Sequence, residues 1–193
     1  CESRMTLTKD TVGPVLSRLY KANVLNQVWA KLYRADLILK NNILFPDYRW
    51  GEDRLFIYDC LEHSEKIEIL PDCNYLYLMH EGESLITKFY DKKLHVCIES
   101  DGRMEAMCFR NGVTDQSVFK YMFAKSVFSC ITTLFAKNCT LTQEEKRAYL
   151  QALLNNEHVH RRCSGTFGGF AVNMDLIAGL PEDSPEGFRQ TLE

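Results

Sequence analysis

The spacing of apolar positions divides the chain into a mixed first part and a helical second part. Apolar residues recur at helical intervals from about Asp10 to Ala22, which predicts a first amphipathic helix. Alternation over Lys66 to Leu70 and over Asn74 to Leu78 predicts two short strands around a turn. The aromatic and apolar run from Val28 to Tyr33 suits a strand or the end of one.

Helices dominate the pattern from about residue 86 onward. Helical spacing is found at 87–99, 102–109, 115–137 and 142–155. Thr142 followed by Glu145 is a capping box, and Asp115 can cap its helix in a similar way. The glycine-rich stretch 163–170 lacks the context of a phosphate loop and predicts a flexible connection. The acidic stretch 181–193 predicts a loosely held tail.

Two acids stand at the start of a predicted helix after a proline and a glycine. A short helix from Ala35 is suited to stop at Asn41 and Asn42, and Pro46 then favours an extended segment. Gly51 precedes a new helix headed by Glu52 and Asp53. Acids in a first helical turn complement the helix dipole, which is worth ~0.3–1 kcal/mol each. The alternative explanation is that Glu52 and Asp53 are catalytic residues.

A longer pattern surrounds this acid pair. It consists of Trp29, Lys31, Leu32, Tyr33, Arg34, Asn42, Ile43, Phe45, Pro46, Gly51, Glu52 and Asp53, followed by Asp72, Tyr75, Tyr77 and Ser84. The pattern resembles the second half of a bacterial family 2 glycosyltransferase. The resemblance implies an α+β, mainly helical fold, in which residues 1–85 form the acceptor-side portion of a GT-A domain with two short strands. Residues 86–193 would then form a helical C-terminal subdomain.

The same resemblance implies an enzyme that transfers a sugar from a nucleotide-sugar donor to a hydroxyl of a glycan or polysaccharide acceptor, with inversion. Asp53 would be the general base, because a sugar hydroxyl is a poor nucleophile until a nearby carboxylate takes its proton. Glu52 would support or orient Asp53. The candidate substrate-binding residues are Trp29, Lys31, Arg34, Trp50, His80 and Ser84.

Parts of the family pattern are missing from the sequence. No Asp-x-Asp motif is present to hold a divalent metal ion against the nucleotide diphosphate. The strand-rich nucleotide-binding half and a glycine-rich phosphate loop are missing as well. We therefore expect a C-terminal fragment of a longer enzyme that uses Mg or Mn, with this chain alone inactive and holding no metal. His80 stands where relatives commonly carry an arginine, and it suits a solvent-facing turn equally well.

Composition narrows the class of protein further. Hydrophobic residues make up 46% of the chain, charged residues 25%, and the formal net charge is −3, which are values typical of a soluble globular protein. No nucleic-acid partner is indicated, and the short basic cluster at 158–162 is explained by solvated surface. The eight cysteines include no Cys-x-x-Cys pair, which favours reduced thiols in the cytoplasm.

The apolar segment from Ser117 to Phe135 comes closest to a membrane span. A span needs about 20 residues, but Lys120 and Lys125 each disfavour insertion by roughly 2.5–3.5 kcal/mol at a helix centre. A core helix is the main interpretation. The alternative is an interfacial helix that makes a peripheral contact with the inner face of a membrane, near lipid-linked acceptors.

The competing class of function is a non-catalytic helical interaction module. In that interpretation Trp29, Tyr33 and Trp50 are core anchors. An exposed Trp50 beside Asp53 in a concave surface favours the enzyme. A buried Trp50, with Asp53 bonded to backbone donors, favours the module.

Overall fold

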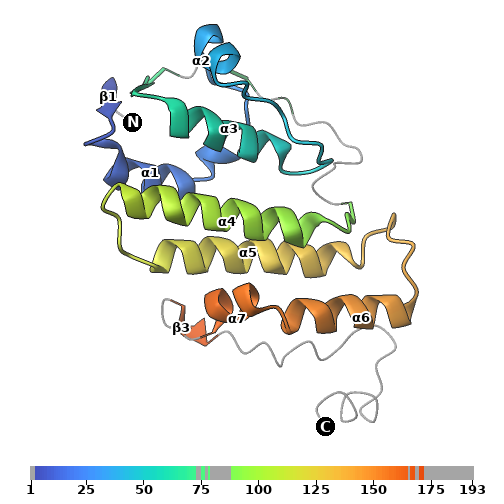
Figure 1. Ribbon diagram of the computed structural model, residues 1–193. Helices are drawn as coiled ribbons and strands as arrows, with labels where there is room; N and C mark the ends of the chain where they lie inside the picture. Colours follow the sequence, from blue (N-terminus) through green and yellow to red (C-terminus); the bar gives the residue numbers. More distant parts are fainter. Residues whose placement is uncertain are drawn as a thin grey trace.

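The computed structural model describes residues 3–72, 75, 76, 78, 88–164, 166, 167, 170 and 171. Over these residues the fold is α+β and mainly helical, which confirms the predicted class. The elements in chain order are β1 Met5–Thr8, α1 Val12–Lys21, the 3-10 helix η1 Val24–Asn26, α2 Ala35–Lys40, α3 Glu52–His63, β2 Lys66–Ile69, α4 Lys93–Arg110, α5 Ser117–Thr133, α6 Gln143–Leu154, α7 Glu157–Cys163, β3 Thr166–Phe167 and β4 Phe170–Ala171 (Figure 1).

The helices are stacked in layers, with α4 and α5 side by side in the middle (Figure 1). Helices α1 and α3 contact α4 from one side, and α7 contacts α5 from the other. The larger apolar core is shared by α1, α3, α4 and α5 and includes Leu16, Leu55, Tyr58, Met104 and Phe119. A second core lies where α4, α5, α6 and α7 meet and includes Cys97, Phe123, Cys130, Leu153 and Val159. The division of the chain at residue 86 stays a prediction.

Strand β2 forms where the sequence predicts it, but its partner differs. It pairs antiparallel with β1, so that Met5 lies opposite Ile69 and Thr8 opposite Lys66. The sequence predicts no strand at β1, because only Leu7 of its four residues is buried and the alternation is too short to detect. Of the strand predicted at 74–78, only residues 75, 76 and 78 are described, and none of them is in a strand.

The strand predicted over Val28 to Tyr33 is wrong. After η1 the chain turns through Ala30, whose φ of 57° is left-handed. The Lys31 ammonium donates a hydrogen bond back to the carbonyl oxygen of Gln27 at 2.6 Å. The segment is therefore a turn followed by irregular chain that leads into α2.

Helix α2 ends as its sequence predicts. Asn42 adopts a left-handed φ of 49°. The Ile43 amide donates to the carbonyl of Ile38 at 3.0 Å, and the Asn42 amide donates to that of Leu39 at 3.4 Å. These two bonds form a Schellman motif, which satisfies carbonyls at the helix end.

In the helical part, α4 is longer than predicted. Helix α4 runs without a break through Gly102, although the sequence predicts separate helices on its two sides. A glycine costs about 1 kcal/mol inside a helix, and burial of Val96, Met104 and Met107 on one face of α4 outweighs this cost. The capping box at Thr142 is confirmed, since its hydroxyl accepts from the Glu145 amide at 3.2 Å.

The C-terminal end of the described chain also differs from the prediction. Helix α7 is not predicted; Asn156 caps it by accepting from the amides of His158 and Val159 at 3.0 and 3.2 Å. The connection predicted as flexible over 163–170 contains the end of α7 and strand β3, which pairs with β4. The predicted acidic tail lies outside the described residues.

Helix α5 covers the segment considered above for membrane contact. Phe119, Phe123, Val127 and Cys130 are buried along it, whereas Tyr121 and Phe128 are exposed. Among the residues that the structure describes, no helix has the length and apolar character needed to cross a bilayer. Peripheral membrane contact stays a prediction.

Two glycines of this fold should respond oppositely to substitution. A Cβ on Gly51, where φ is 80°, would lie 2.7 Å from Cγ1 of the buried Val96, whereas a Cβ on Gly102 meets nothing within 4 Å. We expect Gly51→Ala to lower the free energy of unfolding by about 1–3 kcal/mol, and Gly102→Ala to raise it by about 0.4–1 kcal/mol. Urea denaturation measures both, and equal shifts in the two variants would contradict this account of Gly51.

Candidate functional site

The predicted acid pair lies at the start of α3, held in place by Gly51. This glycine is the N-cap residue of α3, and its lack of a side chain lets the turn approach Val96 of α4. Glu52 and Asp53 follow in the first helical turn, as the sequence predicts, and both are partly exposed. The turn therefore fixes the start of α3 against the central helix α4, and the two acids that follow it stay partly exposed.

Lys31 and Tyr33 lie close enough to Asp53 for its charge to act on them. Burial lowers the pKa of the Lys31 ammonium, and the Asp53 carboxylate raises it again in part. Burial also raises the pKa of the Tyr33 phenol, with smaller contributions from Cys60 and Asp53. The structure thus brings together three residues of the family-like pattern: a carboxylate, an ammonium group and a phenol.

Several aromatic residues of the pattern contact each other. Phe45 stacks on Phe56 of α3 with ring centroids 4.1 Å apart, and Tyr33 meets the edge of Phe56 at 5.4 Å. Trp29 stacks on Tyr75 at 5.0 Å. The contacts of Phe45 and Tyr33 with Phe56 hold the segment between η1 and α3 against α3, which explains these aromatic residues of the motif by packing.

Two predicted substrate-binding residues are engaged elsewhere. The Arg34 guanidinium donates to both carboxylate oxygens of Asp36, at 2.9 and 2.5 Å, at the start of α2. Trp50 is half-buried and contacts both apolar cores. The Arg54 guanidinium lies 5.3 Å from the centroid of its ring, and the Lys93 ammonium lies 5.0 Å from it. The Trp50 environment is that of an anchor in the interior, and His80 and Ser84 lie outside the described residues.

A cavity in the described part of the chain lies away from the acid pair. It has a volume of 410 Å³ and lies at the opposite end of α3, where Leu61 and Glu62 form part of its wall. Other walls come from β1, the start of α1, and the end of α4 at Arg110 and Asn111. Neither Glu52 nor Asp53 lines it.

The described residues do not fit a divalent metal ion. Magnesium and manganese require several oxygen ligands gathered at one point. In the described part of the chain, no three His, Cys, Asp or Glu side chains are grouped to hold a metal ion. We assign no step of chemistry in this chain to a metal.

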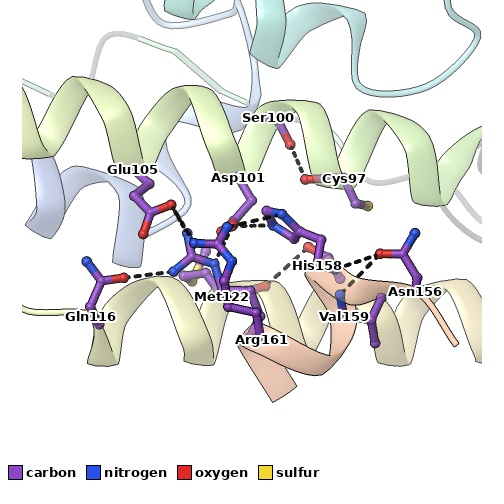
Figure 2. Close-up of polar contacts among 12 residues, drawn as sticks. Cys97, Ser100, Asp101, Glu105, Gln116, Met122, Asn156, His158, Val159 and Arg161 are labelled. Carbon is purple, nitrogen blue, oxygen red and sulfur yellow. Dashed lines mark hydrogen bonds and ion pairs between the residues drawn. The ribbon is translucent and has the colours of Figure 1, made fainter. Parts of the chain in front are cut away.

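A buried polar network joins α4, α5 and α7, and the sequence does not predict it (Figure 2). The Arg162 Nε donates to Asp101 Oδ2 at 2.6 Å, and His158 Nε2 lies 2.9 Å from the same oxygen. Arg162 also forms an ion pair with Glu105 at 2.7 Å and donates to Gln116 Oε1 at 2.8 Å. Burial raises the pKa of Asp101, and the Arg162 guanidinium and the hydrogen bond with His158 oppose this shift.

The interpretation of the basic cluster at 158–162 as solvated surface is therefore wrong for Arg162, which is only 2% exposed. His158 and Arg162 are spaced by four residues on α7, and Asp101 and Glu105 by four on α4, so each pair shares one helix face. This matched spacing is the signal in the sequence. It becomes informative only once the side chains of α7 are known to reach those of α4, as the contact of His158 with Asp101 shows (Figure 2).

Comparison with known proteins gives one partial relative. The chain is 30% identical over 77 residues to "Uncharacterized glycosyltransferase EpsJ" of Bacillus subtilis (strain 168). The match covers 39% of this chain and 22% of that protein. No protein-family model matches the sequence, and no solved structure matches it. The chain is thus related to a glycosyltransferase over part of its length, while membership of family 2 and the GT-A type stay predictions.

Proposed function

We propose that this chain is the acceptor-side part of an inverting, GT-A type glycosyltransferase of family 2. It would act on a nucleotide-sugar donor and a glycan or polysaccharide acceptor. The observation that carries the proposal is Asp53, a partly exposed carboxylate fixed in the first turn of α3 with Lys31 nearby. The partial similarity to a glycosyltransferase supports it.

The proposed role of Asp53 is to accept one proton. As the acceptor hydroxyl oxygen bonds to the anomeric carbon, its proton passes to Asp53, and the bond to the nucleoside diphosphate breaks on the opposite face. The anomeric configuration is inverted by this single displacement. Glu52, its neighbour in the first turn, would orient Asp53.

Substrate binding in the proposal divides between this chain and residues beyond it. Lys31 is a cation close enough to Asp53 for the Asp53 charge to act on it. We propose that its ammonium binds the acceptor or the leaving diphosphate. The nucleotide and a Mg or Mn ion would be held by other parts of the enzyme. Trp29, Arg34, Trp50, His80 and Ser84 stay candidate binding residues. The proposed location is the cytoplasm, at the inner face of a membrane if the acceptor is lipid-linked.

An interaction module is the second candidate, and one observation favours it. The segment around α2 exposes apolar side chains: Leu32 is 99% exposed, Leu39 79% and Leu44 66%. Apolar side chains gathered on a surface are typical of contact with another protein segment. Trp50 is half-buried, which lies between the exposed position expected for the enzyme and the buried position expected for the module.

The test is sugar transfer by the full-length polypeptide that contains this chain. Purified protein is incubated with a panel of nucleotide sugars and oligosaccharide acceptors, and release of the nucleoside diphosphate is measured with and without acceptor. We expect acceptor-dependent release and a product whose anomeric configuration, determined by NMR, is inverted. Retention of configuration would overturn the inverting mechanism. No transfer with any donor, together with partner binding that Leu39→Lys abolishes, would favour the module.

A further inference from the structure

Helix α5 carries large apolar side chains on two opposite sides. On one side Phe119, Phe123 and Cys130 are buried in the two apolar cores. On the other side Tyr121 is 48% exposed and Phe128 is 67% exposed. A helix that is apolar all round is normally buried all round. The exposed side of α5 therefore calls for a contact beyond those that the described chain makes.

The exposed side forms one stripe of aromatic and basic residues. We name it the α5 outer face, and it consists of Tyr121, Lys125, Phe128 and Phe135. Their intervals of four, three and seven residues place side chains on one side of a helix, and Phe135 lies just past the end of α5. The Lys125 ammonium lies 5.6 Å from the centroid of the Tyr121 ring, and the Lys146 ammonium of α6 lies 5.7 Å from that of Phe135. Cations and exposed rings thus alternate along this face.

The charge of this part of the chain is positive, although the whole chain is acidic. Residues 116–143 contain Lys120, Lys125 and Lys137 and no Asp or Glu. The stretch therefore has a formal charge of +3, whereas the chain has −3. The acids that flank it in the sequence are Asp115 and Glu144. A surface of this sign attracts an anionic partner.

We propose that the α5 outer face docks on the surface of an anionic phospholipid bilayer, with the helix lying in the membrane plane. The rings of Tyr121 and Phe128 enter the boundary between headgroups and acyl chains, where aromatic residues are favoured. Lys125 reaches the lipid phosphates while its alkyl stem stays along the apolar surface. Three lysines are few for a nucleic acid, whose binding depends on many phosphate contacts. An apolar protein segment would leave the lysines without an anion.

This docking deepens the proposed function, because it would hold a glycosyltransferase beside lipid-linked acceptors, and to that extent it rests on that function. Vesicle binding and sugar transfer are nevertheless separate measurements. Lys125 and Phe128 lie on α5, whereas the acid pair lies on α3. Variants of the α5 outer face should therefore transfer sugar to a soluble oligosaccharide as the wild type does. Loss of docking with retained transfer would leave the proposed function intact, and the reverse result would leave the docking intact.

The experiment is flotation of the full-length polypeptide with vesicles of equal parts phosphatidylcholine and phosphatidylglycerol, and with vesicles of phosphatidylcholine alone. We expect the protein to float with the anionic vesicles and to remain unbound with the neutral ones. Binding should fall as salt rises from ~0.1 M to ~1 M, because the range of charge interactions shrinks from about 10 Å to about 3 Å. Equal flotation with both kinds of vesicle would overturn the role of the lysines.

Two variants of the α5 outer face test its residues. Lys125→Glu removes one attractive charge and adds a repulsive one, each changing the partition coefficient about fivefold, so we expect binding to weaken by about 25-fold. Phe128→Ser removes the apolar contact of an entering ring and should weaken binding by about tenfold or more. Both side chains are exposed, so circular dichroism and the urea midpoint should match those of the wild type.

Leu39→Ser and Lys40→Glu on α2 are the matched controls. Leu39 is 79% exposed and Lys40 is exposed as well, so these variants change the same two properties on another surface and should retain binding. Equal losses in the α2 variants would overturn the location of the docking face on α5. So would a wild-type protein that does not float, or flotation that Lys125→Glu and Phe128→Ser leave unchanged. Binding of a labelled single-stranded RNA, abolished by these two variants and found without vesicle binding, would assign the face to a nucleic acid instead.

Discussion

Asp53→Asn should lower the rate of sugar transfer by the full-length enzyme by about 10²–10⁴-fold, the range that a general base contributes. The amide has the size of the carboxylate but cannot take the proton of the acceptor hydroxyl. Because Asp53 is partly exposed in the first turn of α3, the substitution should leave the fold unchanged. Steady-state kinetics of nucleoside diphosphate release measures the loss in kcat, and circular dichroism and the urea midpoint measure the fold.

The matched control is Glu144→Gln. Glu144 is also an acid in the first turn of a helix, at the exposed start of α6. Its substitution removes the same kind of favourable contact with a helix dipole, worth ~0.3–1 kcal/mol, and should leave kcat unchanged. Full turnover by Asp53→Asn would remove Asp53 from the role of base. An equal loss of kcat in both variants would show that the effect is not specific to Asp53.

The position of the acid pair could be predicted because the signals that fix it are local. Asn42 ends α2 in the left-handed conformation, and Gly51 begins α3. Such signals act over a few residues and do not depend on distant contacts. The capping box of Thr142 and Glu145 was predictable for the same reason.

The pairing of β1 with β2 could not be predicted, because it joins segments far apart in the chain. Leu7 is the only buried residue of β1, and period-two alternation needs several such positions to be visible. The unbroken α4 shows the opposite effect, in which tertiary burial overrides a local signal. Gly102 weakens the helix locally, yet the buried face around Val96 and Met104 holds it together.

The surroundings of the candidate site residues depend on the same kind of distant contact. The sequence shows Trp50 beside an acid pair, but it does not show that Lys93 of α4 lies against its ring. Arg34 is an exception, because its hydrogen-bond partner Asp36 lies only two residues away in the sequence. Residue type and spacing therefore located the acid pair, whereas the availability of its neighbours required the structure.

Arg162→Met should lower the free energy of unfolding by about 3–5 kcal/mol at neutral pH, because it leaves a buried carboxylate without its main cation. The Arg162 Nε donates to Asp101 Oδ2 at 2.6 Å, and both side chains are buried. Arg161→Met is the matched control, since Arg161 is exposed and contacts Glu105 at 3.3 Å. An exposed pair of this kind contributes about 0–1 kcal/mol. Urea denaturation at pH 7 measures both variants, and equal losses would contradict a special role for the buried arginine.

The pH dependence of this loss tests its cause. Burial already raises the pKa of Asp101 in the native protein, and removal of Arg162 takes away an opposing influence. A carboxyl group whose pKa is higher in the folded than in the unfolded protein does not destabilise the fold at a pH low enough to protonate it in both states. As the pH rises from the unfolded pKa to the folded pKa, the group lowers the free energy of unfolding progressively. The difference in unfolding free energy between Arg162→Met and wild type should therefore narrow as the pH falls from 7 towards the ordinary aspartate value of about 3.9. The double variant with Asp101→Leu should recover stability relative to Arg162→Met and lose this narrowing, because no buried carboxylate remains. A gap that stays constant with pH would instead attribute the loss to packing around Phe119, over whose ring the guanidinium lies.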